Sequence, residues 1–138
     1  MKIALTSFRD AKNWEGTSCS IARWQPVWSS MPEFPIDVKP VYKGEKLSEW
    51  MKPVEYKRKY NLILKEKEDK LIDFFSRIES DEPIILCCWC TLDRQPQFKG
   101  KLFCHRILLG WWIEEHFKYA MVKYADGAES PIWKKICV

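Results

Sequence analysis

The sequence predicts an α/β domain in which a mainly parallel β-sheet is flanked by helices. Short apolar segments typical of strands alternate with segments whose apolar residues recur every three or four positions, which is the helical period. Residues 84–90 form a continuous apolar run, as expected for a strand buried inside a parallel sheet. A chain of 138 residues is long enough for one core and too short for two, so residues 1–138 are predicted to form a single compact domain.

The first 40 residues are expected to supply two strands and a long loop. Residues 2–8 and 18–24 have the apolar pattern of short strands, and the polar segment between them contains a turn at Gly16. Four prolines lie between positions 26 and 40, which excludes a helix or an inner strand there. Loops of this length inside compact domains are often functional. This one is expected to be held against the body by Trp24, Trp28, Met31 and Phe34.

The rest of the chain is expected to supply the helices and the remaining strands. A short helix is predicted over residues 46–51, and Pro53, a favourable first-turn residue, opens a long helix that ends near Ile78. The apolar face of that helix consists of Val54, Tyr60, Ile63, Leu64, Leu71, Phe74, Phe75 and Ile78. The remaining elements are predicted in the order strand 84–90, helix 104–118, strand 119–124 and a terminal strand over 132–138.

Composition and charge narrow the classes of function. The formal net charge of +4 is weak evidence for an anionic partner, and the basic residues are not clustered as in a sequence-specific nucleic-acid-binding protein. The start has no export signal, and no apolar run approaches the ~20 residues that span a bilayer. Six cysteines without an export signal indicate reduced thiols in the cytoplasm. Eight tryptophans are expected to fill the core, with stacking of one or two on a planar ligand as the alternative.

The segment between residues 83 and 118 is predicted to contain the functional site. It reads as a strand, a polar loop and a helix that opens at Cys104, and ligands of parallel α/β sheets bind at such junctions, outside the carboxyl ends of the strands. The side chains expected to gather there are Cys88, Cys90, Arg94, Cys104, His105 and Arg106. Strand alternation places Cys88 and Cys90 on one face and Cys87 on the other.

Cys104 and His105 are the catalytic candidates. A helix N-terminus favours negative charge, so it lowers the pKa of a thiol and also attracts a phosphate or carboxylate. The alternative is a small buried residue that caps the helix. Because neighbours on a helix point in different directions, separate contacts of the two side chains to one ligand are expected, and not a direct contact between them. Arg9, Arg23, Arg94 and Arg106 are candidate anion clamps, since arginine makes bidentate contacts to oxyanions; each has the alternative role of a surface residue.

Neither a metal nor another cofactor is predicted. Cys88, Cys90, Cys104 and His105 are ligands of the kind that zinc prefers, but the paired C-x-x-C units of a closed zinc site are absent. The spacing from Cys88 to Arg94 matches the C-x5-R pattern of thiol phosphatases, although the loop contains no glycine and continues into Gln95-Pro96-Gln97.

The chain also resembles a known family. The run IILCCWC, the loop after it, and Cys104-His105-Arg106 before a helix that contains Trp-Ile-Glu-Glu are similar to the prokaryotic domain-of-unknown-function family 488. Trp50, Tyr56 and Arg58-Lys59-Tyr60 resemble the W-x-x-Y-x-x-R-Y pattern of that family, and Ser7-Phe8-Arg9 resembles its opening. The resemblance implies a compact α/β fold and a site around Cys104, and it implies no particular activity.

Together these features predict a cytoplasmic domain that binds a small anionic ligand, such as a nucleotide or sugar phosphate, beside the start of the helix at Cys104. A first alternative is a protein-interaction module, accessory or phage-encoded, that uses the Pro- and Trp-rich residues 24–40. A second is nucleic-acid binding through basic residues and exposed tryptophans. A concave site that gathers Arg9, Cys104, His105 and Arg106 would favour the first hypothesis, and a flat apolar patch around Trp28 and Phe34 the interaction module.

Overall fold

A four-stranded parallel sheet forms the centre of the molecule, in the strand order β2-β5-β1-β6. The computed structural model describes residues 1–48, 50–89 and 104–124. The strands are β1 (Lys2–Ser7), β2 (Thr17–Ser20), β5 (Ile84–Cys88) and β6 (Met121–Tyr124). Three helices flank the sheet, namely α1 (Pro53–Glu66), α2 (Glu68–Ser76) and α3 (His105–His116). The predicted α/β class, with a mainly parallel sheet, is confirmed.

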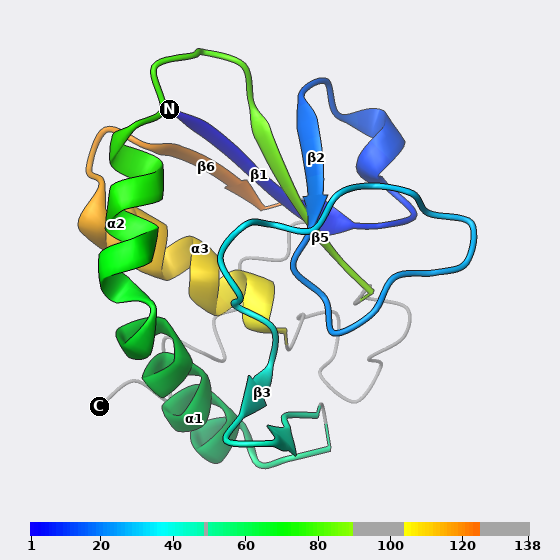
Figure 1. Cartoon of the computed structure of the whole chain (residues 1–138), viewed down its shortest axis with the longest axis vertical. Coiled ribbons are helices and arrows are strands. Elements are labelled where there is room, and N and C mark those ends of the chain that lie inside the picture. The colour runs from blue at the N-terminus through cyan, green and yellow to red at the C-terminus, as the bar shows by residue number, and fades with distance from the viewer. Residues whose placement is uncertain (49, 90–103, 125–138) are drawn as a thin grey trace.

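The strand register aligns the carboxyl ends of the inner strands. Ser7 of β1 pairs with Cys88 of β5, and Ser20 of β2 pairs with Cys87, so all three strands end at the same edge. Every residue of β1 after Lys2 is buried, as is β5 after Ile84, as expected for inner strands covered on both faces. In Figure 1, α1 and α2 follow one another along one side of the molecule, and α3 lies between them and the sheet.

The long helix predicted from Pro53 to Ile78 is two helices. Pro53 occupies the first turn of α1 as predicted, but Lys67 ends that helix and precedes α2. The break falls in the polar run 65–70, where no side chain is buried, so the apolar pattern does not mark it. Val54, which we assigned to the apolar face, is exposed, whereas Tyr56 and Tyr60 are buried.

A β-hairpin replaces the start of the helix predicted over 46–51. Strands β3 (Val41–Tyr42) and β4 (Glu45–Lys46) pair antiparallel across Lys43 and Gly44. Both turn residues have positive φ, 49° and 82°, which is the geometry of a tight two-residue hairpin turn. No helix is assigned to the described residues between 47 and 52.

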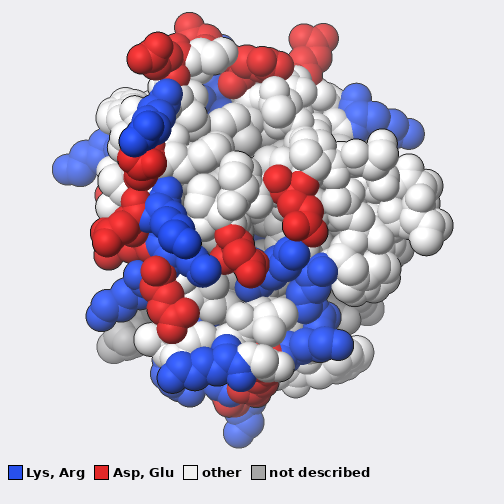
Figure 2. Space-filling model, viewed as in Figure 1, with Lys and Arg blue, Asp and Glu red and all other residues white. Residues whose placement is uncertain are grey.

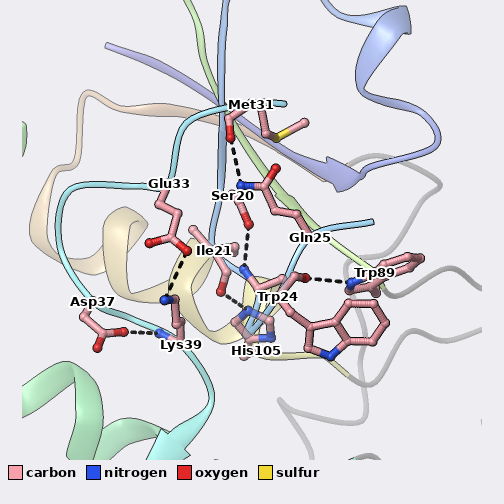
Figure 3. Close-up of polar contacts among 11 residues, drawn as sticks. Ser20, Ile21, Trp24, Gln25, Met31, Glu33, Asp37, Lys39, Trp89 and His105 are labelled. Carbon is pink, nitrogen blue, oxygen red and sulfur yellow. Dashed lines mark hydrogen bonds and ion pairs between the residues drawn. The ribbon is translucent and has the colours of Figure 1, made fainter. Parts of the chain in front are cut away.

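The second strand is shorter than predicted, because the chain turns away after Ser20. The Ser20 amide donates to the Pro32 carbonyl at 2.8 Å, and an isolated bridge joins Ser20 to Glu33. At the tip of the long loop that follows, the Gln25 side-chain amide donates to the Met31 carbonyl at 2.8 Å (Figure 3). The prediction for the residues that hold this loop is confirmed for Phe34, which is buried together with Ile36 and Val38, and Met31 is partly buried against the core. It is wrong for Trp28, which is exposed; Trp24 is exposed as well but packs on the ring of Trp89.

The last portion of the described chain agrees with the predicted elements. Helix α3 begins at His105 and β6 ends at Tyr124, close to the predicted limits. A short 3-10 helix, η1 (Ala11–Asn13), lies between β1 and β2. The strand predicted over 132–138 lies outside the described residues. No helix among the described residues is long and apolar enough to cross a membrane.

Candidate functional site

The end of β5 and the start of α3 bring together the residues of the candidate site. Cys88 is the last residue of β5, and Cys104 is the N-cap of α3, followed by His105 and Arg106 in the first turn. The four residues are almost completely inaccessible, with 1%, 1%, 4% and 0% of their surface exposed. Four of the six residues predicted for this junction therefore form a single buried cluster.

The two thiols of this cluster are in direct contact. The Sγ atoms of Cys88 and Cys104 lie 3.3 Å apart, although the residues are separated by 16 positions. The Arg106 guanidinium donates through Nη1 to the Cys88 sulfur at 3.7 Å. A positive group therefore lies beside one of the two sulfurs.

His105 contacts the other sulfur, contrary to our expectation. Its Nδ1 lies 3.5 Å from the Sγ of Cys104. The two side chains meet because Cys104 is not helical: its backbone is extended, with φ −155° and ψ 148°, so its side chain need not diverge from that of His105. This contact joins the two catalytic candidates.

The second ring nitrogen of His105 fixes the tautomer. Nε2 lies 3.0 Å from the backbone carbonyl of Ile21, the first residue after β2, as Figure 3 shows. A carbonyl oxygen only accepts hydrogen bonds, so Nε2 carries the proton and Nδ1 presents a lone pair to the Cys104 thiol. The loop after β2 thus orients the imidazole as a proton acceptor toward the sulfur.

Burial keeps the imidazole neutral. Desolvation lowers the pKa of His105, and the charges of Arg106 and Arg23 lower it further, while Cys88 and the hydrogen bond to Ile21 act in the opposite direction. Tyr60 of α1 packs against the imidazole with the ring centroids 5.5 Å apart, and its hydroxyl donates to the Val38 carbonyl at 2.9 Å. Burial also raises the pKa of Tyr60 well above its ordinary value, so this hydroxyl stays protonated.

The remaining predicted site residues lie in different surroundings. Arg23 is half-buried on the loop after β2, and its charge acts on His105. Arg9 is largely exposed, with its Nε 3.7 Å from the Asp10 carboxylate, and lies outside the buried cluster. Cys90 and Arg94 lie outside the described residues, as does the loop whose C-x5-R spacing we noted. The ligand-binding roles of these four residues stay predictions.

Two further thiols differ from those of the cluster. Cys19 of β2 and Cys87 of β5 are buried, and desolvation raises the pKa of each to about 12. Cys87 is next to Cys88 in sequence but faces the other side of the strand. Both remain protonated at neutral pH, which makes them internal references for the reactivity of Cys88 and Cys104.

Two groups contribute to the site that were not predicted from the sequence, the ring of Tyr60 and the carbonyl of Ile21. The periodicity of α1 predicted a buried Tyr60, and the family resemblance included it, but neither predicted its contact with His105. The Ile21 carbonyl is a backbone group, for which the side-chain sequence holds no signal. Within the described residues, no group of three His, Cys, Asp or Glu residues is arranged to hold a metal ion. Since Cys90 is not described, the absence of zinc stays a prediction.

Comparison with protein-family models, with curated proteins and with solved structures finds no match to this chain. The resemblance to the domain-of-unknown-function family 488 therefore stays a prediction from the motifs alone.

Proposed function

We propose that this domain binds a small anionic ligand, such as a nucleotide or sugar phosphate, at the carboxyl edge of the sheet beside the start of α3. The observation that carries the proposal is the position of Arg106, a fully buried guanidinium in the first turn of α3. Arginine keeps its charge when buried, and the amides of a helix N-terminus add a positive field at the same place. The first turn contains no acidic residue that would offset this field.

One further basic residue supports an anion at this edge. Arg23, half-buried on the loop after β2, helps to lower the pKa of His105 through its charge, so a second positive charge acts on the cluster. The neutral His105 presents a proton acceptor to Cys104, and these two residues are the candidates for catalysis on a bound ligand. Arginine side chains suit phosphate oxygens because their planar donors bind two oxygens at once.

The proposal is tested by calorimetric titration of the reduced chain with inorganic phosphate, a nucleoside monophosphate and a hexose phosphate. We expect saturable binding of at least one probe. Arg106→Lys keeps the charge but loses the planar donor fork, so it should weaken that binding about tenfold. Arg23→Gln should weaken it as well.

Arg77→Gln is the matched control. Arg77 lies just after α2, is exposed, and pairs with Asp73 at 2.9 Å, so this variant removes one positive charge away from the carboxyl edge. Binding should be unchanged in this variant. Failure of all three probes to bind the wild-type chain, or equal weakening in the Arg77 variant, would contradict the proposal.

One observation favours the protein-interaction alternative. Trp24, Val27 and Trp28 are exposed to 60%, 104% and 65%, so the loop after β2 carries large apolar side chains in solvent. Phe34, which we expected in this patch, is buried. A photo-crosslinking residue at position 28 would then capture one partner protein that the same residue at the exposed Tyr119 does not, and Trp24→Ser would abolish the capture.

Nucleic-acid binding has less support. Figure 2 shows basic and acidic side chains interspersed over α1 and α2 on the face in view, without a continuous basic surface. A phosphate backbone is bound by clustered lysine and arginine, and such a cluster is not seen on this face.

A further inference from the structure

We propose that Cys88 and Cys104 form a redox-active dithiol, which a small hydroperoxide converts into an intramolecular disulfide and an external dithiol restores. The inference concerns the chemistry of the two sulfurs and does not depend on the bound anion proposed above. It starts from their contact distance of 3.3 Å. A disulfide bond is about 2.05 Å long, so the two sulfurs need to approach by only about 1.3 Å.

The hydrogen bonds around the two sulfurs have a consistent direction. Arg106 can only donate, so the Cys88 sulfur accepts from it. At the other end, Nδ1 of His105 accepts, so the Cys104 thiol is the donor in that contact. The Cys88 thiol is then the donor to the Cys104 sulfur. The chain of hydrogen bonds runs from Arg106 through Cys88 and Cys104 to His105.

This arrangement assigns different roles to the two cysteines. Cys104 lies beside a proton acceptor, so it is the thiol that is activated as a nucleophile. Cys88 lies beside a permanent positive charge, which stabilises negative charge on its sulfur as its proton leaves. His105 and Arg106, adjacent residues of α3, therefore supply the proton acceptor for Cys104 and the positive charge for Cys88.

The oxidation proceeds in two balanced steps. The Cys104 thiol gives its proton to Nδ1 of His105, and the sulfur attacks one oxygen of the hydroperoxide. The O–O bond breaks, the departing oxygen takes the proton from His105, and Cys104 becomes a sulfenic acid while the hydroperoxide is reduced to water or an alcohol. The Cys88 sulfur then attacks Cys104, the S–O bond breaks, and the hydroxyl group leaves with the Cys88 proton as water.

Burial sets the class of oxidant. Only about 1% of the surface of either cysteine is exposed, so a small oxidant reaches the sulfurs more readily than a bulky disulfide such as oxidised glutathione does. Hydrogen peroxide is a very small oxidant, and we choose it as the probe.

Cys19 and Cys87 are also buried, and their high pKa keeps them protonated. The Cys87 thiol lies 3.9 Å from the Ile85 carbonyl, which is too weak a base to remove its proton. These two cysteines should not react.

The experiment treats the reduced, full chain with a small excess of hydrogen peroxide and maps disulfides by mass spectrometry of a non-reducing digest. We expect a Cys88–Cys104 linkage, which dithiothreitol removes. Replacing the proton acceptor, in His105→Asn, should slow its formation by about a hundredfold, the scale of a general base. Cys87→Ser, one residue from Cys88 and equally buried, should form the linkage at the wild-type rate.

The mapping of the wild-type chain decides the proposal even if variants of the cluster fail to fold. Persistence of both thiols, oxidation of either cysteine to a sulfinic acid without the linkage, or disulfides that join other cysteines would each overturn it. If the disulfide forms at the same rate in the wild-type chain and in a folded His105→Asn variant, His105 is not the proton acceptor for Cys104. Phosphate binding is measured separately, so the two proposals can fail independently.

Discussion

The four buried cysteines that the structure describes fall into two chemically different pairs. Cys19 and Cys87 are surrounded by the core, which raises their pKa because a thiolate there would lose its hydration. Cys88 and Cys104 are as deeply buried, but a guanidinium and a neutral imidazole are among their neighbours. The reactivity that we expect of each thiol therefore depends on the groups next to its sulfur and not on its exposure.

The first prediction compares two thiols of similar exposure. In the reduced chain at neutral pH, iodoacetamide should modify Cys104 at least about tenfold faster than Cys87, because the thiolate is the reactive form and a pKa of about 12 leaves Cys87 almost entirely protonated. Peptide mapping over time gives both rates in one sample. Similar rates for the two residues would mean that His105 does not activate Cys104.

A second prediction concerns His105 and acid. Since burial lowers its folded-state pKa, the unfolded chain binds a proton near pH 6.5 that the folded chain does not. This residue therefore makes stability fall as the pH decreases below about 6.5, with a slope of up to about 1.4 kcal/mol per pH unit. Urea unfolding between pH 7.5 and 5 measures this slope.

The two histidines of α3 provide the control for that measurement. His105→Gln should flatten the pH dependence of the free energy of unfolding, whereas His116→Gln should preserve it. His116 is near the surface, with Nε2 3.1 Å from the Glu68 carboxylate and Nδ1 2.8 Å from the Trp112 carbonyl. A slope that disappears in the His116 variant and persists in the His105 variant would show that the wrong histidine had been assigned.

At the scale of elements, α3 connects the sheet to the site because it lies very close to β1 and β6. A Cβ atom added to Gly110 would lie 2.5 Å from Cδ1 of Leu5 and 2.7 Å from Cε1 of Tyr124. Both distances are too short for carbon atoms in contact. The absence of a side chain at Gly110 is therefore what lets the helix approach the strands.

The third prediction follows from this close approach. On an unobstructed helix, replacing glycine with alanine stabilises by up to about 1 kcal/mol, whereas overpacking costs about 1–3 kcal/mol. Leu5 is fully buried and cannot move into solvent, so Gly110→Ala should lower the free energy of unfolding by a net 1 kcal/mol, roughly. Urea denaturation measures it, with the exposed Glu115→Ala in the same helix as control. Stabilisation by the Gly110 variant would show that α3 can shift.

The elements differ in how far the sequence predicts them. The apolar run before Cys88 and the first turn after Cys104 define a buried strand and a helix start, because burial on both faces and helical spacing leave direct patterns. The break at Lys67 and the hairpin at Lys43 leave no such sequence pattern, since both lie in polar segments where tertiary contacts decide the path of the backbone. The contact between Cys104 and His105 depended on whether one residue is inside or outside the helix, which spacing does not resolve.

At the scale of the whole molecule, the strand order explains how the core supports the site. β1 and β5 are the inner strands, and the pairing of Ser7 with Cys88 places the site directly on their ends. The loop after β2 is attached differently. Its tip is held by the Gln25–Met31 hydrogen bond and by Trp89, whose indole N–H donates to the Trp24 carbonyl at 2.8 Å, while the tryptophan rings pack 4.6 Å apart (Figure 3).

Native-state hydrogen exchange tests whether the inner strands are more stable than the tip of the loop after β2. Amides of β1 and β5 should exchange most slowly, through global unfolding, because both strands are paired on two sides and buried. Amides between residues 24 and 30 should exchange through local opening, since the exposed Trp24, Val27 and Trp28 contribute little to the core. The Ile21 amide, which donates to the Cys87 carbonyl at 2.9 Å, should follow the strands. If Ile21 instead exchanged with the loop tip, the carbonyl that orients His105 would not be rigidly held, and the tautomer on which the thiol chemistry depends would lose its support.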